Sequence, residues 1–410
     1  MIIALTIALV TLALIAAAGV IYLLLRARNS THWFFPYLRD LRRQRRQQAA
    51  FAAATPPPTR HIMLCICDHF EPYWRNTDDT LADERVTRWC EGFPAMAQEF
   101  TDADGRHPQH TFFYPEDEYR YEHVERIAGL CNRGFGEIEL HAHHEDTDVE
   151  VYRARMMAFV ERMHSEHGVF PVHPETGKPA WAFVHGDWAL CNSRGDGTGC
   201  GIDAELPLLK EMGCVVDYTL PSAPCDAQTR KINSIYYAND IPGQSKSHDT
   251  GIDVVAGRPG SGDMLLVQGP LGWNLKRRKW GLVPRLENGE LTGMHPGDPQ
   301  RVDLWVKTGV SVVGRPEWTF IKLHTHGTVE RDEDALLGDT MRRMHQHLAD
   351  QYNDGSRFAL HYVTAREMYN IIRAAEQGKS GNPGEYRDFE LPSPVYHERQ
   401  ELPLSAARQQ

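Results

Sequence analysis

The chain has 410 residues, enough for two or three domains of about 150 residues, or for one barrel of about 250 residues with insertions. Its hydrophobic content of 41% and charged content of 24% are those of a globular protein and exclude a disordered or fibrous chain. The net charge of −11 is unevenly spread, because residues 26–46 hold seven arginines and one aspartate and carry +6. The remaining −17 argues against nucleic acid as the main partner.

The first 25 residues carry no charged side chain, and positions 2–25 are almost entirely Ile, Leu, Val and Ala. A run of this length predicts a transmembrane helix that spans the bilayer with some tilt. A cleaved signal peptide fits less well, because no Lys or Arg precedes the run and apolar residues continue past Ala16–Ala18, the stretch that resembles a cleavage site. We therefore predict an uncleaved membrane anchor over residues 1–25.

A basic juxtamembrane segment with a proline-rich linker is expected over residues 26–58. Its seven arginines and the aromatic residues at positions 33–37 are typical of a segment at a membrane surface. The positive-inside rule then predicts a single-pass membrane protein with its body in the cytoplasm. A periplasmic body is the alternative.

Several familiar chemical signatures are missing from the sequence. Eight cysteines are present without any C-x-x-C pair, so a structural zinc knot is not expected. Most of these cysteines lie in apolar stretches, which predicts buried free thiols and weakly favours a reducing compartment. The chain has no G-x-S-x-G elbow, and its glycine-rich stretch at 257–262 lacks the lysine of a phosphate-binding loop. A serine hydrolase and a nucleotide-binding protein are therefore disfavoured.

Strands and helices are expected to alternate along the chain after residue 58. The pattern predicts strands at 61–67, 111–114, 137–140, 181–184, 214–220, 319–323 and 358–362, and helices over 80–100, 121–131, 148–167, 202–212, 333–350 and 364–376. Residues 221–300 are rich in Gly, Pro, Ser and Asn and are expected to form long loops or an insertion. Residues 379–410 are expected to be a polar tail.

The alternation predicts an α/β fold with a parallel sheet. An open doubly wound sheet and a barrel both fit, and the positions of the polar residues favour the barrel. They follow the carboxyl ends of the strands, where a barrel would bring them to one face: residues 68–69, 114–117, 141–144, 185, 187, 217, 324 and 326. The predicted fold is a closed or nearly closed (β/α) barrel of about seven strands over residues 59–378, preceded by one transmembrane helix.

The densest group of potential metal ligands follows the strand at 137–140. His141, His143, His144, Glu145 and Asp146 lie within six residues of one another. Because this group continues a buried strand, metal binding is favoured over a solvated surface cluster. Imidazole with carboxylate suits zinc, and also Co, Ni, Mn or Fe.

Three other strand ends carry similar side chains. Asp68 and His69 follow the first strand, where either could bind metal, one could act as a base, or Asp68 could cap the next loop. On a later strand, His324 or His326 could be a ligand or a general acid, and at least one could instead hydrogen-bond behind the ligands. His185 and Asp187 are weaker candidates, whereas His345 and His347 are expected to be solvated on a helix.

These residues resemble the motifs of the polysaccharide deacetylase (NodB-homology) family, in particular a divergent membrane-anchored branch found with bacterial exopolysaccharide genes. The resemblance covers roughly residues 60–376 and rests on Asp68–His69, on His141-x-x-His144 and on Leu323–His324. It implies an incomplete β/α barrel, a divalent metal, and hydrolysis of N-acetyl or O-acetyl groups on sugars. The departures are His69 in place of the family's second aspartate, Glu145 at the position of its second histidine, and no clear R-x-P motif.

The resemblance also implies roles for individual residues. Asp68 would be the base, His69, His141 and His144 would bind the metal, and His324 would protonate the leaving group. His143 could replace His144 as a ligand. Additional candidates for the site are Glu145, His185, Asp187 and His326, and Trp188, Tyr119 and Trp74 could stack on sugar rings, although core packing explains them equally well.

The expected function is thus metal-dependent removal of acetyl groups from a polysaccharide or lipid-linked sugar. One divalent ion is expected, with zinc as the preferred metal. Exopolysaccharide assembly proteins are possible partners. Two alternatives remain open. One is another metal hydrolase, such as a phosphoesterase, an amidohydrolase or a glycoside hydrolase of the same superfamily. The other is a non-catalytic glycan-binding subunit of a polysaccharide assembly complex.

Overall fold

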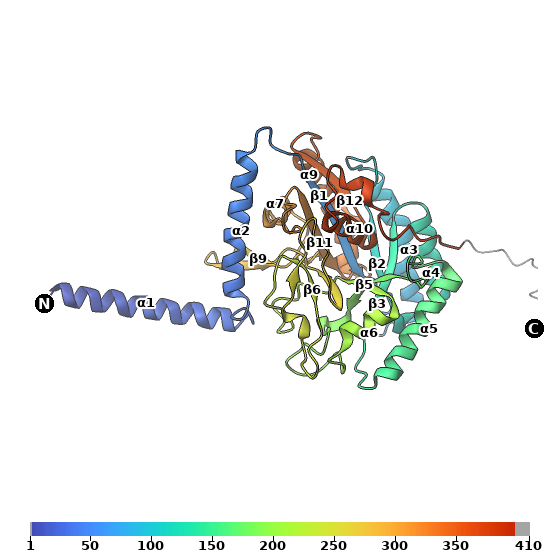
Figure 1. Cartoon of the computed structure of the whole chain (residues 1–410), viewed down its shortest axis with the longest axis horizontal. Coiled ribbons are helices and arrows are strands. Elements are labelled where there is room, and N and C mark those ends of the chain that lie inside the picture. The colour runs from blue at the N-terminus through green and yellow to red at the C-terminus, as the bar shows by residue number, and fades with distance from the viewer. Residues whose placement is uncertain (1, 398–410) are drawn as a thin grey trace, which may run out of the picture.

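The computed structural model describes residues 2–397. Two helices precede the folded body, α1 (Ile2–Arg26) and α2 (Phe34–Ala53). Figure 1 shows α1 extending away from the body as an isolated rod, while α2 lies along the side of the body at a steep angle to α1. No residue of α1 is buried, and within the described residues it is the one helix that is long and apolar enough to span a membrane.

The segment that follows α1 is packed on the body. Trp33 is fully buried and stacks on Trp273, with ring centroids 5.9 Å apart, and Arg28 lies over the same Trp273 ring. Farther along α2, the Asn233 side chain donates a hydrogen bond of 2.6 Å to the buried carboxylate of Asp40. Part of the basic segment is therefore an element of the fold, not only a linker.

A ten-stranded, mostly parallel sheet forms the centre of the body. Its pairing order is β11, β1, β2, β3, β4, β5, β8, β6 and β7, and β12 also pairs with β1. All pairings are parallel except those of β6 with β8 and with β7. The strands are β1 (Arg60–His69), β2 (His110–Pro115), β3 (Gly136–Ala142), β4 (Trp181–His185), β5 (Cys214–Asp217), β6 (Ile235–Ala238), β7 (Ile252–Asp253), β8 (Met264–Val267), β11 (Trp318–Thr325) and β12 (Phe358–Tyr362).

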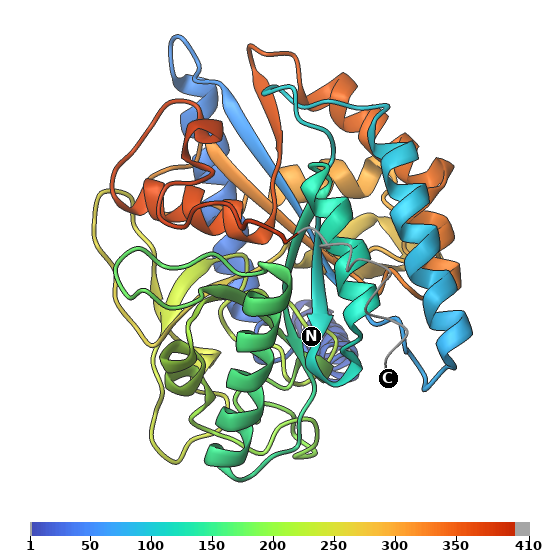
Figure 2. The same ribbon diagram turned by 90° about the vertical axis from the view of Figure 1, so that its right-hand side faces the viewer.

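Each face of the sheet has its own apolar core, because side chains alternate along the strands. On β1, Ile62 and Leu64 belong to a core shared with seven helices, whereas Met63 and Cys65 belong to a core shared with α10 (Ala365–Glu376). Figure 2 shows α10 on the opposite side of the sheet from α3. The seven helices are α3 (Asp79–Ala97), α4 (Tyr121–Asn132), α5 (Val149–His167), α6 (Glu205–Met212), α7 (Pro299–Thr308), α8 (Glu330–Leu337) and α9 (Asp339–Tyr352).

The expected barrel is found only in part. The fold is α/β with a mostly parallel sheet, but the pairing path ends at β11 and β7, and the described residues show no pairing between these two strands. Barrel closure is therefore not shown. The face of the sheet that carries Met63 and Cys65 is covered by α10, and nearly every residue of α10 is buried.

The stretch 221–300, expected to be loops or an insertion, contains part of the main sheet. β8 lies between β5 and β6, and a separate antiparallel hairpin is formed by β9 (Gly272–Lys279) and β10 (Val283–Glu287). The prediction was wrong for β8, because its four-residue apolar run among glycines is too short to show a period.

The beginning of the predicted tail is fixed on the body as far as residue 397. Leu391 and Tyr396 are buried, and the Arg387 guanidinium pairs with the carboxylates of Glu367 and Asp102. The described part of the tail is therefore a strap across the body. Residues 398–410 lie outside the described part of the chain.

Candidate metal centre and active site

Three buried donor side chains meet at the carboxyl ends of β1 and β3, and we call this group site A. His69 ends β1, Glu71 follows two residues later, and His141 lies near the end of β3. One ligand atom from each residue lies within 4.8 Å of the others, and all three side chains are nearly inaccessible to solvent. Active sites of parallel α/β folds lie at this end of the strands.

The hydrogen bonds of site A suit it to a cation. The Nδ1–H of His141 donates to the Val184 carbonyl over 2.8 Å, so Nε2 of the neutral ring carries a lone pair. This lone pair faces the Oε1 atom of Glu71 at 3.0 Å. Burial lowers the pKa of His141 to about 3 and raises the pKa of Glu71 to about 7. Two acceptors that face each other in a buried site need a proton or a metal ion between them, and this donor set fits a divalent metal.

His143 stands at the rim of site A and has a carboxylate on each side. Its Nε2 lies 3.6 Å from Glu71 Oε1 and its Nδ1 lies 3.4 Å from Asp117 Oδ1, while 32% of its side chain stays exposed. Burial alone would lower the pKa of His143, but the Asp117 and Glu71 carboxylates outweigh burial and raise it. His143 is therefore the imidazole of this region best able to hold a proton near neutral pH.

Two further histidines lie at the carboxyl end of β11, His324 within the strand and His326 just after it. The half-buried His326 ring lies 4.7 Å from the His69 ring and 5.1 Å from the Trp74 ring, measured between centroids. His324 is buried, its Nδ1 has no hydrogen-bond partner among the described residues, and burial lowers its pKa to about 3. His326 is therefore partly open to solvent, whereas His324 is enclosed and neutral at pH 7.

Asp68 has surroundings that differ from those expected of a base. Its Oδ2 accepts a hydrogen bond from His110 Nε2 over 2.9 Å, and its Oδ1 accepts one from the Gly327 amide over 2.6 Å. By the alternation of β1, its side chain points to the opposite face of the strand from His69. Both carboxylate oxygens hold neighbouring groups in place, including the backbone just after His326. This geometry does not support the role of general base.

His144 lies in a second buried group, which we call site B. Its Nε2 is 3.0 Å from Glu205 Oε1 and 3.1 Å from His185 Nε2, and Cys200 completes the group. Burial alone would raise the pKa of Glu205, but His185 and His144 outweigh it and lower that pKa. The structure therefore does not bring His144 together with His141. The adjacent residues His143 and His144 point to different sites, as alternation along an extended chain dictates.

Four other predicted residues lie outside both sites. Glu145 is exposed and accepts a hydrogen bond from the Gly199 amide, and Asp187 is exposed as well. Trp188 is half-buried. The Tyr119 hydroxyl bonds with two side chains of α5. None of these four is placed as a ligand, and Trp74 is the one predicted aromatic residue that contacts a histidine of the site.

Sequence reasoning missed three donors of the two sites. Glu71 carries a usable signal, because it stands two residues after His69 and alternation places both on one side of the extended chain. Cys200 and Glu205 carry none, because they come from an irregular stretch and the first residue of α6. Only the folded chain brings them to His144.

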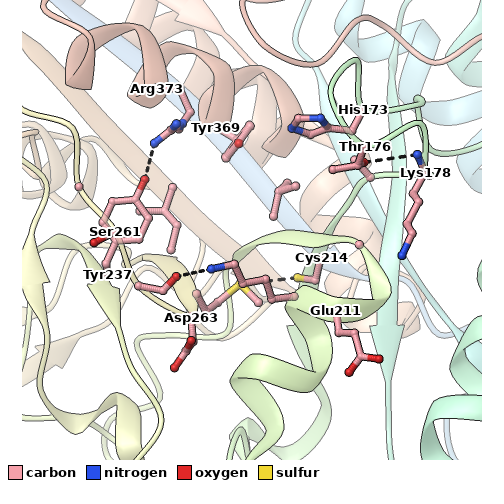
Figure 3. Close-up of a pocket in the computed structure, with 18 of the residues that line it drawn as sticks. His173, Thr176, Lys178, Glu211, Cys214, Tyr237, Ser261, Asp263, Tyr369 and Arg373 are labelled. Carbon is pink, nitrogen blue, oxygen red and sulfur yellow. Dashed lines mark hydrogen bonds between the residues drawn. The ribbon is translucent and has the colours of Figure 1, made fainter.

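A cavity of about 640 Å³ adjoins the rim of site A and is lined by Tyr73, Asp117 and Arg120, among others. A cavity of about 690 Å³, shown in Figure 3, lies at the other end of the strands, since Cys214 and Met264 in its lining begin β5 and β8. This cavity shares no residue with site A or site B. Of these two cavities, the one beside site A reaches a partner of its rim, because Asp117 lines it and contacts His143.

Comparisons with known proteins give little further information. No family model matches the chain, and no curated protein matches it. Among solved structures, it is similar to a crystal structure of a candidate glycoside hydrolase/deacetylase from Parabacteroides distasonis, with 12% sequence identity and a TM-score of 0.38. That match covers 75% of this chain and 69% of the other. A likeness at this level carries no argument about activity, so the function has to be argued from the site.

Proposed function

We propose that the protein is a metal-dependent hydrolase that removes acetyl groups from a polysaccharide or a lipid-linked sugar. The observation that carries the proposal is site A, in which two buried imidazoles and a buried carboxylate converge at the carboxyl ends of parallel strands. The choice of an acetyl group rests on the sequence resemblance at Asp68–His69, His141 and His324 to polysaccharide deacetylases.

His69, Glu71 and His141 would hold one divalent ion. Three protein ligands are the usual set of a catalytic zinc site, which keeps a position open for substrate or water. When bound, such an ion polarises a carbonyl oxygen and lowers the pKa of a bound water. Glu71 is ionised in that state, because a nearby cation offsets the burial that otherwise favours the protonated carboxyl.

His143 is the proton donor in this proposal. It stands at the rim beside the cavity, and Asp117 both orients the ring and favours its protonated form. A proton held on His143 can pass to the leaving amine or alcohol of the sugar. We assign this role to His143 instead of His324, because a buried imidazole with a pKa of about 3 carries no proton to give at pH 7.

His326 is the proton acceptor in this proposal. It is the half-buried imidazole whose ring lies against that of His69, and the Asp68 contact with the Gly327 amide fixes the backbone that carries it. Asp68 is thus a positioning residue. Trp74, which stands against the His326 ring, offers an aromatic face on which a sugar ring can stack.

We also propose that α1 anchors the protein in a bacterial inner membrane, with the body on the cytoplasmic side. The exposed arginines of α2 support this side: Arg39, Arg42, Arg45 and Arg46. Arg28, two residues after α1, donates a 3.0 Å hydrogen bond to the Pro284 carbonyl of the β9–β10 hairpin. The tip of this hairpin exposes 79% of both Trp280 and Leu282, which suits a membrane interface. A lipid-linked sugar or an exopolysaccharide assembly protein would meet the enzyme at this surface.

A two-metal phosphoesterase is the less favoured alternative. In two-metal hydrolases the ions lie about 3.5–4 Å apart and act on one substrate. Sites A and B share no donor residue, and site B is fully enclosed by protein. The arrangement therefore fits one reactive ion at site A.

The test is an acetate-release assay on the full-length protein in detergent, with acetylated glycans and p-nitrophenyl phosphate as parallel substrates. We expect acetate release that falls by about a hundredfold or more in His143→Gln, in line with loss of a general acid. The matched control is His347→Gln, which removes a partly exposed histidine that pairs with Asp303 on α7. Glycan binding without acetate release would indicate a non-catalytic glycan-binding subunit and overturn the proposed activity. Release of phosphate without release of acetate would also overturn the proposal.

A further inference from the structure

Site B brings together four donors from four separate segments. His144 follows β3, His185 ends β4, Cys200 lies in the irregular stretch after β4, and Glu205 begins α6. Cys200 is 1% exposed, His185 and Glu205 are 0% exposed, and the His144 side chain is also inaccessible. These four side chains are enough to supply the four ligands of a tetrahedral metal site. Two imidazoles, a thiol and a carboxyl are all common zinc ligands.

The distances in site B match the edges of a tetrahedron. Zinc–nitrogen bonds of about 2.0–2.1 Å place the donors of a tetrahedral site about 3.3 Å apart. His144 Nε2 is 3.0 Å from Glu205 Oε1 and 3.1 Å from His185 Nε2, and His185 Nε2 is 3.3 Å from Glu205 Oε1. The Cys200 Sγ atom is 3.6 Å from the other carboxylate oxygen of Glu205. One ion at the centre can therefore reach all four residues.

The hydrogen bonds around site B leave its donors pointing at one another. The Nδ1–H of His185 donates to the Gly186 carbonyl over 2.6 Å, so Nε2 of the neutral ring carries the lone pair. His144 Nδ1 is buried and has no partner among the described residues. The Cys191 amide donates to Glu205 Oε2 over 2.7 Å and so orients the carboxylate. A buried carboxylate beside two imidazole nitrogens and a thiol is costly unless a proton or a metal ion lies between them.

We propose that site B is a structural metal site in which His144, His185, Cys200 and Glu205 bind one zinc ion, separate from the ion of site A. The charges balance, because a thiolate and a carboxylate together neutralise a divalent cation. Four protein ligands leave no open position, which is the pattern of structural and not of catalytic zinc. The soft thiolate makes zinc a better occupant than magnesium or calcium.

Site B would fix the shape of site A. His143 stands at the rim of site A and His144 belongs to site B, so the ion of site B would hold the backbone between them. Gly186, which follows the site B ligand His185, packs against the His143 ring so closely that a Cβ atom there would lie 2.2 Å from it. The ion would also tie the irregular residues 189–204 to the strand ends. Its role is therefore to position the rim of the active site.

The first test is spectroscopic. The full-length protein is produced in cobalt-supplemented medium, purified in detergent, and scanned for the sulfur-to-cobalt charge-transfer absorption in the near ultraviolet. Site A contains no cysteine, so this band would report site B alone. We expect the band in the wild type and in Cys225→Ser, a half-buried cysteine outside both sites, and its loss in Cys200→Ser. Cobalt-loaded wild type without the band would overturn the proposal.

The second test counts ions by elemental analysis of the same full-length protein. We expect about two divalent ions per chain in the wild type, and one fewer in Cys200→Ser and in Glu205→Gln. The proposal fails if Cys200→Ser keeps the metal content of the wild type, which would leave site B a hydrogen-bonded cluster only. Neither readout uses enzymatic activity, so a failure here is distinguishable from a failure of the proposed hydrolase.

Discussion

Gly186→Ala tests the role of His143 without changing any ionisable group. A Cβ atom at position 186 would lie 2.2 Å from Cδ2 and 2.9 Å from Nε2 of the His143 ring. Carbon atoms in ordinary contact stand about 3.5–4.0 Å apart, so the ring has to move by more than about 1 Å. The His143 side chain is 32% exposed, so the ring can swing outward, away from Glu71 and Asp117. The substitution should therefore remove the proton donor while the buried ligands keep their places.

A displacement of about 1 Å in a reacting group can cost about a hundredfold in rate. We expect kcat for acetate release to fall by about that factor in Gly186→Ala, with the metal content unchanged and the free energy of unfolding altered by less than about 1 kcal/mol. The double variant with His143→Gln should be no slower than His143→Gln alone, because both changes remove the same group.

The matched control is Gly129→Ala in α4, where an added Cβ has no atom within 4 Å. This control should keep full activity. Full activity in Gly186→Ala, together with a large loss in His143→Gln, would refute the steric reasoning. A strictly additive double variant would refute the shared role.

Three further predictions follow from other parts of the structure. Asp68→Asn should lower the free energy of unfolding by about 1–3 kcal/mol as well as the turnover, because the buried partners of the carboxylate lose a charged acceptor; a drop in turnover at unchanged stability would instead favour a general base. His345 has a pKa that burial lowers to about 3 from the ordinary 6.5, so the unfolded chain binds more protons below pH 6.5 and stability falls as the pH falls from 6.5 toward 3. Between pH 7 and pH 5, the free energy of unfolding measured in urea should fall by about 2 kcal/mol less in His345→Phe than in the wild type, and equal decreases in the two proteins would contradict this. In nanodiscs, brominated lipid should quench Trp280, measured as the difference between the wild type and Trp280→Phe, and identical quenching of both would place the hairpin away from the membrane.

Much of the fold follows from local patterns in the sequence. Apolar runs such as 61–67 and 137–140 predicted the strands β1 and β3, and the polar residues directly after them predicted where the chemistry lies. His69 and His141 could be placed together because the carboxyl ends of parallel strands share one edge of a sheet. A change from apolar to polar residues marks the end of a buried strand, because polar side chains are placed where the strand leaves the apolar core.

The remaining features depend on contacts between distant segments. The sequence cannot show that His143 and His144 belong to different sites, because that depends on which side of the strand end each partner occupies. His345 was expected to be solvated from its charged neighbours, but the structure buries it against Tyr362. Cys200 was not singled out from the sequence, and only the folded chain places it beside Glu205.

The metal content of Glu71→Gln tests the central claim most directly. The full-length wild type and the variant are purified in parallel without added metal, and the divalent ions per chain are counted by elemental analysis. We predict that Glu71→Gln contains about one ion fewer than the wild type, because the neutral amide cannot replace the carboxylate between His69 and His141. Equal metal content in a folded Glu71→Gln protein would contradict the assignment of site A as the catalytic metal centre.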